Sequence, residues 1–154
     1  MKKSTIMIVI IVFLLLIIGF MVYFESFNIN NKLTMDDVNF TLPDGFHIGN
    51  PNNAGDINLT DGNISIFIKN YDDADIVRYV NSYSNLSEKN NYTIISSNFT
   101  IDNIVVYKSV NNDTGSEYFW FVKNNKVFNI YVWGNYTNVD TKIFDLIKST
   151  DYTT

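Results

Sequence analysis

The sequence predicts an α+β domain with a mainly antiparallel sheet, attached to one N-terminal transmembrane helix. An uncharged apolar run at 6–24 predicts the membrane-spanning helix. Strand-like segments between 92 and 133 are joined by links too short for a parallel crossover, which indicates an antiparallel meander. Segments with helical hydrophobic spacing flank the meander at 72–83 and 139–147. Together these observations predict one compact domain with a helix on each side of its meander in the chain.

The apolar run reads IMIVIIVFLLLIIGFMVYF and contains no charge and no proline. As a helix it would be about 28 Å long, close to the hydrocarbon thickness of a bilayer. Because Lys2 and Lys3 precede it, the positive-inside rule predicts a cytoplasmic tail at 1–5 and a domain outside. The alternative is a cleaved signal peptide, but its apolar core would be shorter and would end in small residues. We therefore expect an uncleaved, single-pass anchor in the cell membrane, with the lipid bilayer as its partner through 6–24.

Between the anchor and the first helix of the domain, the chain predicts short strands and turns. Residues 25–37 are polar with little periodicity and predict a stalk, so the domain would occupy 38–152. Pro43-Asp44-Gly45 predicts a turn, and composition predicts a loop at 49–62. The expected strands are Val38–Leu42, Phe46–Ile48 and Asn63–Lys69.

The first helix of the domain is expected at Asp72–Tyr83, followed by a loop at 85–91. Asp72 or Asp73 could cap it, since a carboxylate can accept hydrogen bonds from the free N–H groups of the first turn. The residues that would face inward share one side of the helix: Ile76, Val77, Val80 and Tyr83.

The second half of the chain predicts the meander and a closing helix. The links between its strands include Asp102-Asn103 and Lys123 to Asn125. The expected strands are Tyr92–Ile101, Ile104–Val110, Glu117–Val122 and Lys126–Trp133. Thr137 or Asn138 would cap the closing helix, and residues 151–154 would form a frayed tail. The inward face of that helix would hold Val139, Ile143, Leu146 and Ile147.

Two short motifs resemble the Mog1/PsbP-like superfamily. The segment Phe40-Thr41-Leu42-Pro43-Asp44-Gly45-Phe46 is similar to the opening hairpin of that family, with Phe46 where the family has tryptophan. The segment 143–149, IFDLIKS, is similar to its final helix. The order of elements agrees over roughly residues 38–150. The resemblance implies an α/β/α sandwich and mostly accessory, non-enzymatic or membrane-tethered roles, with no shared catalytic residues.

Composition excludes several classes of function. The net charge is −5, and without Lys2 and Lys3 the remaining nine basic and sixteen acidic residues give −7. An acidic domain without a basic cluster is a poor partner for nucleic acid. The chain has no cysteine, which excludes disulfides, thiolate metal sites and cysteine nucleophiles.

The sequence contains no recognisable catalytic or metal-binding constellation. His47 is the only histidine and Arg78 the only arginine, so no Ser-His-Asp set forms without His47, which we interpret as a structural or surface residue. Oxygen ligands at 72–75 and 111–117 could bind calcium, but neither segment has EF-hand spacing, and helix capping and a hairpin turn explain both. We expect no metal and no cofactor. Paired carboxylates need no fixed spacing in sequence, so a small hydrolase remains an alternative.

Asparagine forms eight N-x-[ST] patterns, about twice the number expected by chance. They are typical of a glycosylated surface protein, or equally of an Asn-rich composition. Asn39 and Asn98 lie on expected strands and are poorer acceptors. The better candidates lie in expected loops or at the ends of elements: Asn58, Asn63, Asn112 and Asn135.

The aromatic residues of the meander are the candidate binding feature. Alternation along the strands places four of them on one face: Tyr118, Trp120, Tyr131 and Trp133. If helices covered only the other face, these rings could form an exposed platform for sugar rings or a partner protein. If helices covered both faces, as the resemblance implies, the rings would be core. We expect the second arrangement, most clearly for Trp120 in mid-strand and less so for Trp133 beside Gly134.

The sequence thus predicts a membrane-anchored extracytoplasmic domain that acts without catalysis in cell-surface binding or assembly. Its expected partner is another envelope protein or a surface polysaccharide. The alternative function is a small envelope hydrolase or carbohydrate-active enzyme that uses paired carboxylates.

Overall fold

The computed structural model describes residues 11–19 and 31–152. Residues 11–19 are helical. The rest of the expected anchor, 6–10 and 20–24, lies outside the described residues, as does the expected tail at 1–5. Within the described ranges, no helix has the length and hydropathy that a membrane span requires. The chain divides into two units, 1–32 and 33–154.

The second unit has the α+β architecture that the sequence predicts, with two helices and two antiparallel sheets. The larger sheet has the strand order β3-β4-β5-β9-β8-β7-β6, and the smaller has the order β1-β2-β10. The helices are α2 (Ile76–Lys89) and α3 (Val139–Lys148). The strands are β1 (Lys32–Met35), β2 (Val38–Thr41), β3 (His47–Ile48), β4 (Ile57–Thr60), β5 (Ser65–Tyr71), β6 (Ile94–Ile101), β7 (Ile104–Asn111), β8 (Ser116–Lys123), β9 (Lys126–Val132) and β10 (Asp151–Tyr152).

The predicted meander is confirmed: β6, β7, β8 and β9 pair in sequence order, all antiparallel. Two of its turns are two-residue links at 102–103 and 124–125, in which every residue has a positive φ. Asp and Asn tolerate this left-handed conformation better than most residues, and it matches the twist of hairpin strands. Local turn chemistry therefore fixes the register of this half of the sheet.

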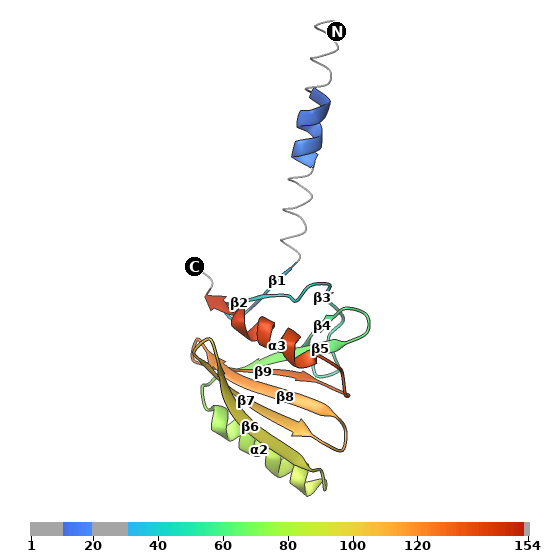
Figure 1. Cartoon of the computed structure of the whole chain (residues 1–154). Coiled ribbons are helices and arrows are strands. Elements are labelled where there is room, and N and C mark those ends of the chain that lie inside the picture. The colour runs from blue at the N-terminus through green and yellow to red at the C-terminus, as the bar shows by residue number, and fades with distance from the viewer. Residues whose placement is uncertain (1–10, 20–30, 153–154) are drawn as a thin grey trace, which may run out of the picture. The chain divides into compact units, whose positions relative to one another are not determined.

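The two helices lie on opposite faces of the large sheet (Figure 1). On the α3 face, the four predicted inward residues of α3 are all buried against phenylalanine and aliphatic side chains of the sheet, such as Phe119, Phe128 and Ile130. Asn138 stands at the N-cap position but has a φ of 64° and makes no side-chain capping hydrogen bond. The helix and the position of its cap are therefore as predicted, but the Asn138 side chain makes no capping hydrogen bond.

Helix α2 begins later and ends later than the sequence predicts. Strand β5 continues to Tyr71, and the Asp73 carbonyl then accepts the Val127 N–H at 2.8 Å. This keeps the chain along the sheet, so the cap is Asp75, whose carboxylate accepts the Arg78 N–H at 3.1 Å. Neither predicted cap is used, and the helix occupies most of the expected loop at 85–91. Val77 is 50% exposed, so its predicted inward position is wrong, and Tyr79 packs toward the sheet instead.

The N-terminal part of the domain differs most from the prediction. The last residues of the expected stalk form β1, with Leu33 buried, and the expected loop at 49–62 contains β4. Residues 151–152 of the expected frayed tail form β10, which pairs with β2 through Asp151 and Asn39, and the rest of that tail lies outside the described residues. Because β2 belongs to the small sheet and β3 to the large one, the two do not form the expected hairpin. Strand β10 depends on a partner distant in sequence, whereas β1 and β4 each pair with the next strand in the chain but are only four residues long, within segments whose polar composition indicates a stalk or loop.

Candidate functional site

Helix α2 covers only part of its face of the large sheet. It packs on β8 and β6 and encloses Trp120 and Val127 together with Val80 of the helix. Beyond this contact, the ends of β5 and β9 and the loop at 52–56 border an open groove of about 520 Å³. We call it the aromatic groove, and its lining residues are Asn52, Asn53, Ala54, Asp56, Lys69, Tyr118, Asn129, Tyr131 and Trp133.

The four aromatic residues singled out in the sequence form one continuous stack. Ring centroids are 5.7 Å apart for Trp120 and Tyr118, 5.4 Å for Tyr118 and Tyr131, and 5.6 Å for Tyr131 and Trp133. The first two pairs are nearly parallel, with interplanar angles of 16° and 13°. Neighbouring rings therefore cover one another's faces and do not form a flat, exposed platform.

The stack runs from the core to solvent. Trp120 and Tyr131 are 2% and 4% exposed, Tyr118 is half-buried, and Trp133 is 51% exposed. Trp120 is thus a core residue, as the sequence predicts. Trp133 packs on the ring of Phe67 at 5.1 Å and donates its indole N–H to the Tyr118 hydroxyl at 3.3 Å. One aromatic ring is therefore both exposed and held in a defined orientation.

Two residues of the 52–56 loop connect the stack to polar groups. The Tyr131 hydroxyl accepts a hydrogen bond from the Asn52 amide at 2.7 Å and donates one to the Asp56 carboxylate. Burial raises the pKa of the Tyr131 phenol, and the Asp56 carboxylate raises it further, so the hydroxyl remains a donor at physiological pH. Sequence analysis interpreted this segment only as a loop. The only pattern in this segment is a cluster of turn-forming residues, and such a cluster does not indicate that the loop borders a groove.

The floor and rim of the aromatic groove carry further polar side chains. Asn129, 2% exposed, donates its amide hydrogen to the Phe119 carbonyl at 3.2 Å and lines the groove floor. The Lys69 ammonium lies 5.2 Å from the ring centroid of Tyr71 at the α2 side. The groove thus combines an exposed indole with amides, one carboxylate and one ammonium group.

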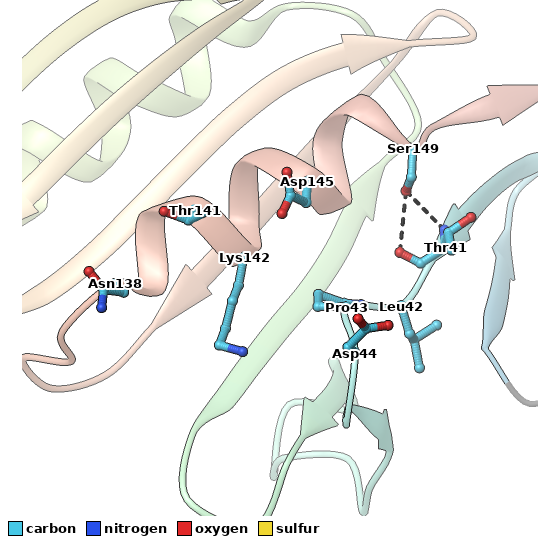
Figure 2. Close-up of a pocket in the computed structure, with 9 residues that line it drawn as sticks. All are labelled: Thr41, Leu42, Pro43, Asp44, Asn138, Thr141, Lys142, Asp145 and Ser149. Carbon is cyan, nitrogen blue, oxygen red and sulfur yellow. Dashed lines mark hydrogen bonds between the residues drawn. The ribbon is translucent and has the colours of Figure 1, made fainter.

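A second groove, of about 570 Å³, lies between α3 and the segment after β2. Its lining residues are Thr41, Leu42, Pro43, Asp44, Asn138, Thr141, Lys142, Asp145 and Ser149. In Figure 2 the Ser149 hydroxyl meets the Thr41 backbone, accepting its N–H at 2.9 Å. The same hydroxyl donates to the Leu146 carbonyl at 2.7 Å, and Lys142 extends toward Pro43 and Asp44. These bonds join the C-terminal end of α3 to β2, so we interpret this groove as a packing seam.

A charged cluster lies on the α3 face. The Lys108 ammonium is 2.8 Å from Glu117 and 2.7 Å from Asp140. Burial and the nearby Asp140 carboxylate raise the pKa of Glu117, while Lys108 opposes that rise. Burial lowers the pKa of Lys108, but hydrogen bonds to both carboxylates outweigh it and the pKa is raised. The two carboxylates are thus bridged by a protonated lysine.

The other residues considered in the sequence are scattered. His47 is exposed on β3. Asp73 pairs with Arg78, and Asp113 accepts the Thr93 N–H, which are structural uses of the two acidic segments. Among the residues that the structure describes, no three His, Cys, Asp or Glu side chains are placed to hold a metal ion.

The candidate glycosylation sites differ in accessibility. Asn58 lies in β4 with its side-chain oxygen enclosed, and its amide lies close to Gly49. The other three candidates are exposed in turns or loops: Asn63, Asn112 and Asn135.

No known family model matches the sequence, and no curated protein sequence matches it. Solved structures do match the fold. A protein from Bacteroides thetaiotaomicron aligns with a TM-score of 0.54 and 11% identity over 81% of this chain, which spans about half (49%) of that protein. The cyanobacterial PsbP (CyanoP) of Synechocystis aligns with a TM-score of 0.50 and 12% identity, over 79% of this chain and 91% of that one. At these identities the likeness shows a PsbP-like fold and nothing further.

Proposed function

We propose that this chain is a membrane-anchored extracytoplasmic domain that acts without catalysis, by binding a component of the cell surface in the aromatic groove. The observation that carries the proposal is Trp133, an exposed indole fixed by Phe67 and Tyr118 at the mouth of the groove. Large exposed aromatic side chains at a concave surface are characteristic of binding sites. A tryptophan that served only the core would be covered, as Trp120 is.

The chemistry of the groove supports binding over catalysis. Its carboxylate, Asp56, is hydrogen-bonded to Tyr131 and Asn52, and it contains no histidine. Such fixed hydrogen bonds hold the surface in shape before a ligand arrives, which lowers the entropy cost of binding. The PsbP-like fold supports the same proposal, since the resemblance implies mostly accessory, non-enzymatic roles.

The apolar run at 6–24 supports the location. It would hold the domain outside the cell membrane, where Asn63, Asn112 and Asn135 would be open to glycosylation in a glycosylating host. Protease added to intact cells should remove the domain and leave an N-terminal fragment in the membrane. Release of a soluble product beginning near Ser26 would instead indicate a cleaved signal peptide.

Binding is tested with the full chain in its own membrane. We expect the wild-type chain to capture an envelope component that co-purifies after mild cross-linking, and Trp133→Ala to lose it. Ile48→Ala is the matched control, because Ile48 is 52% exposed and lies outside the lining of the groove. Equal capture by the wild-type chain and Trp133→Ala would contradict the proposal.

The alternative, a hydrolase with paired carboxylates, has one supporting observation. Glu117 and Asp140 approach the same lysine, and the pKa of Glu117 is raised as a general acid requires. However, the bridging ammonium of Lys108 occupies the space in which a substrate oxygen would have to bind. Hydrolysis of envelope polymers that Glu117→Gln abolishes would favour this alternative.

A further inference from the structure

We infer that the ligand of the aromatic groove is an uncharged carbohydrate chain, an inference that rests on the proposed function and names its ligand class. A sugar ring has an apolar C–H face and an edge of hydroxyl groups, so its site needs an exposed aromatic ring beside groups that both donate and accept hydrogen bonds. The aromatic groove provides this combination, whereas the groove beside α3 has no aromatic ring among its lining residues.

The aromatic part is Trp133. One portion of its indole packs on Phe67 and Tyr131, and the 51% that is exposed faces solvent at the groove. The hydrogen bond from its N–H to the Tyr118 hydroxyl uses the polar atom of the indole and fixes the ring plane. What is presented to a ligand is therefore apolar ring surface in a fixed orientation, as stacking on a sugar face requires.

The polar part lies within the same lining. Asn52 and Asn53 come from the loop, and Asn129 and Lys69 come from the sheet. The Asn52 amide donates to Asp56 and Tyr131 and accepts the Ala54 and Asp56 N–H groups, so Asn52 shapes the loop. The amide of Asn53 both donates and accepts, which suits hydroxyl groups, each of which also does both. Asn129 is almost completely buried, so its position is set by the sheet and not by solvent.

Charge distinguishes a neutral ligand from an acidic one. The groove contains one ammonium group, Lys69, and one carboxylate, Asp56, which balance each other. The surrounding chain is acidic, with a net charge of −5. An acidic polymer would be repelled by this field and would find no arginine or lysine cluster, whereas an uncharged chain of hydroxyl groups would not be affected.

The shape of the site fits a short stretch of a chain. A volume of about 520 Å³ is within the range of small-molecule sites, and the groove is open along the sheet instead of closed as a pocket. A second depression lined by Tyr83, Tyr92 and Trp133 continues past the indole toward the end of α2. A linear polymer could therefore pass over Trp133 and contact both sides of it.

The test uses the full chain in lipid nanodiscs, without any sugar-based detergent. The probes are insoluble neutral polysaccharides (cellulose, chitin, β-glucan and mannan) and two acidic ones, alginate and polygalacturonate. We expect retention on at least one neutral polymer, release by its soluble oligosaccharide, and little change with salt. Trp133→Ala should weaken binding about tenfold or more, the loss expected for one aromatic contact. Trp133→Tyr, which keeps a ring, should retain part of the affinity, and Ile48→Ala should bind as wild type.

Thermal unfolding of each variant verifies that it is folded. Retention on none of the neutral polymers, salt-sensitive retention on the acidic ones, or equal binding by Trp133→Ala would overturn the carbohydrate inference. Failure of the proposed function gives a different result. If Trp133→Ala loses an envelope polypeptide while no polysaccharide binds, the binding domain stands and only the ligand class is wrong.

Discussion

The two faces of the large sheet come from the same strands but differ in how completely their side chains are buried. On the α3 face, alternate residues such as Phe119, Phe121 and Phe128 are completely buried. On the α2 face, their neighbours range from buried Trp120 to half-exposed Trp133. Alternation along a strand assigns residues to faces, but it does not determine how much of a face is covered. One face has become core, and the other is divided between core and surface.

The difference has an identifiable cause. The α3 face is covered by α3 and also by residues of the small sheet, Leu33, Val38 and Phe40, and Figure 1 shows these strands beside α3. The α2 face has a single helix as its cover, and that helix packs on β8 and β6. Tyr71 at the end of β5 still stacks on Tyr79 of α2, but Lys69 and the end of β9 border the open groove beside the 52–56 loop. The open groove lies on the part of this face that α2 does not cover.

The largest expected effect comes from removing the cover of the α3 face. A full chain that ends at Thr137 lacks α3 and β10, so Val139, Ile143 and Leu146 no longer shield the sheet. We expect aggregation and no cooperative thermal unfolding, measured by size-exclusion chromatography and circular dichroism. A chain that ends at Ser149 keeps α3 and serves as the control. A soluble, cooperatively unfolding product ending at Thr137 would show that the sheet does not need α3 to cover this face.

The second test is at the covered part of the α2 face. Trp120→Ala removes a buried ring that packs on Tyr83 and Tyr118 and leaves a cavity. We expect a loss of about 3–5 kcal/mol in the free energy of unfolding, a severe loss against a typical total of about 5–15 kcal/mol. Urea denaturation measures it. An unchanged midpoint would mean that α2 does not form a core with this face.

The third test concerns the charged cluster of the α3 face. Lys108→Met leaves Glu117 and Asp140 facing each other, and we expect a loss of roughly 1–3 kcal/mol at pH 7, between the values for exposed and buried pairs. The folded-state pKa of Glu117 is already raised by burial, and removal of the lysine raises it further. A carboxyl whose pKa is raised in the folded state destabilises the fold as pH rises through that pKa. The loss of unfolding free energy caused by Lys108→Met should therefore become smaller as pH falls toward 4. A deficit that grows in acid would contradict this assignment.

The smallest effect on stability is expected at the open part of the α2 face. Trp133→Ala removes a half-exposed ring, and the loss should be limited to its contacts with Phe67 and Tyr131, about 1 kcal/mol or less. Unfolding in urea, run beside Trp120→Ala, gives the direct comparison. If the two alanine variants lost equal stability, Trp133 would belong to the core and the proposed groove would lose its exposed ring.

Prediction from sequence succeeded where structure depends on neighbours in the chain. The strands of the meander are joined by short Asn- and Asp-containing turns, so they were predicted with bounds close to the observed ones. The inward face of α3 follows helical spacing, and its four inward residues were predicted correctly. It failed for β10, whose partner β2 lies at the other end of the domain sequence. Prediction failed as well for β4, which pairs with the neighbouring β5 but lies in a segment whose Gly, Pro, Asn and Asp content indicates a loop. It also failed for the start of α2, because a hydrogen bond from Val127 holds Asp73 along the sheet.

The candidate site shows the same division. Sequence by itself determined that Tyr118, Trp120, Tyr131 and Trp133 share a face, because successive side chains of a strand point to opposite sides. It could not determine that Tyr118 and Tyr131 stack on each other, or that Asn52 and Asp56 would meet Tyr131 from 75 or more residues away in the chain. The exposure of these aromatic side chains depends on where α2 and the 52–56 loop pack on the sheet. That is set by packing between distant segments, so only the tertiary structure decided which tryptophan became core and which remained at the surface.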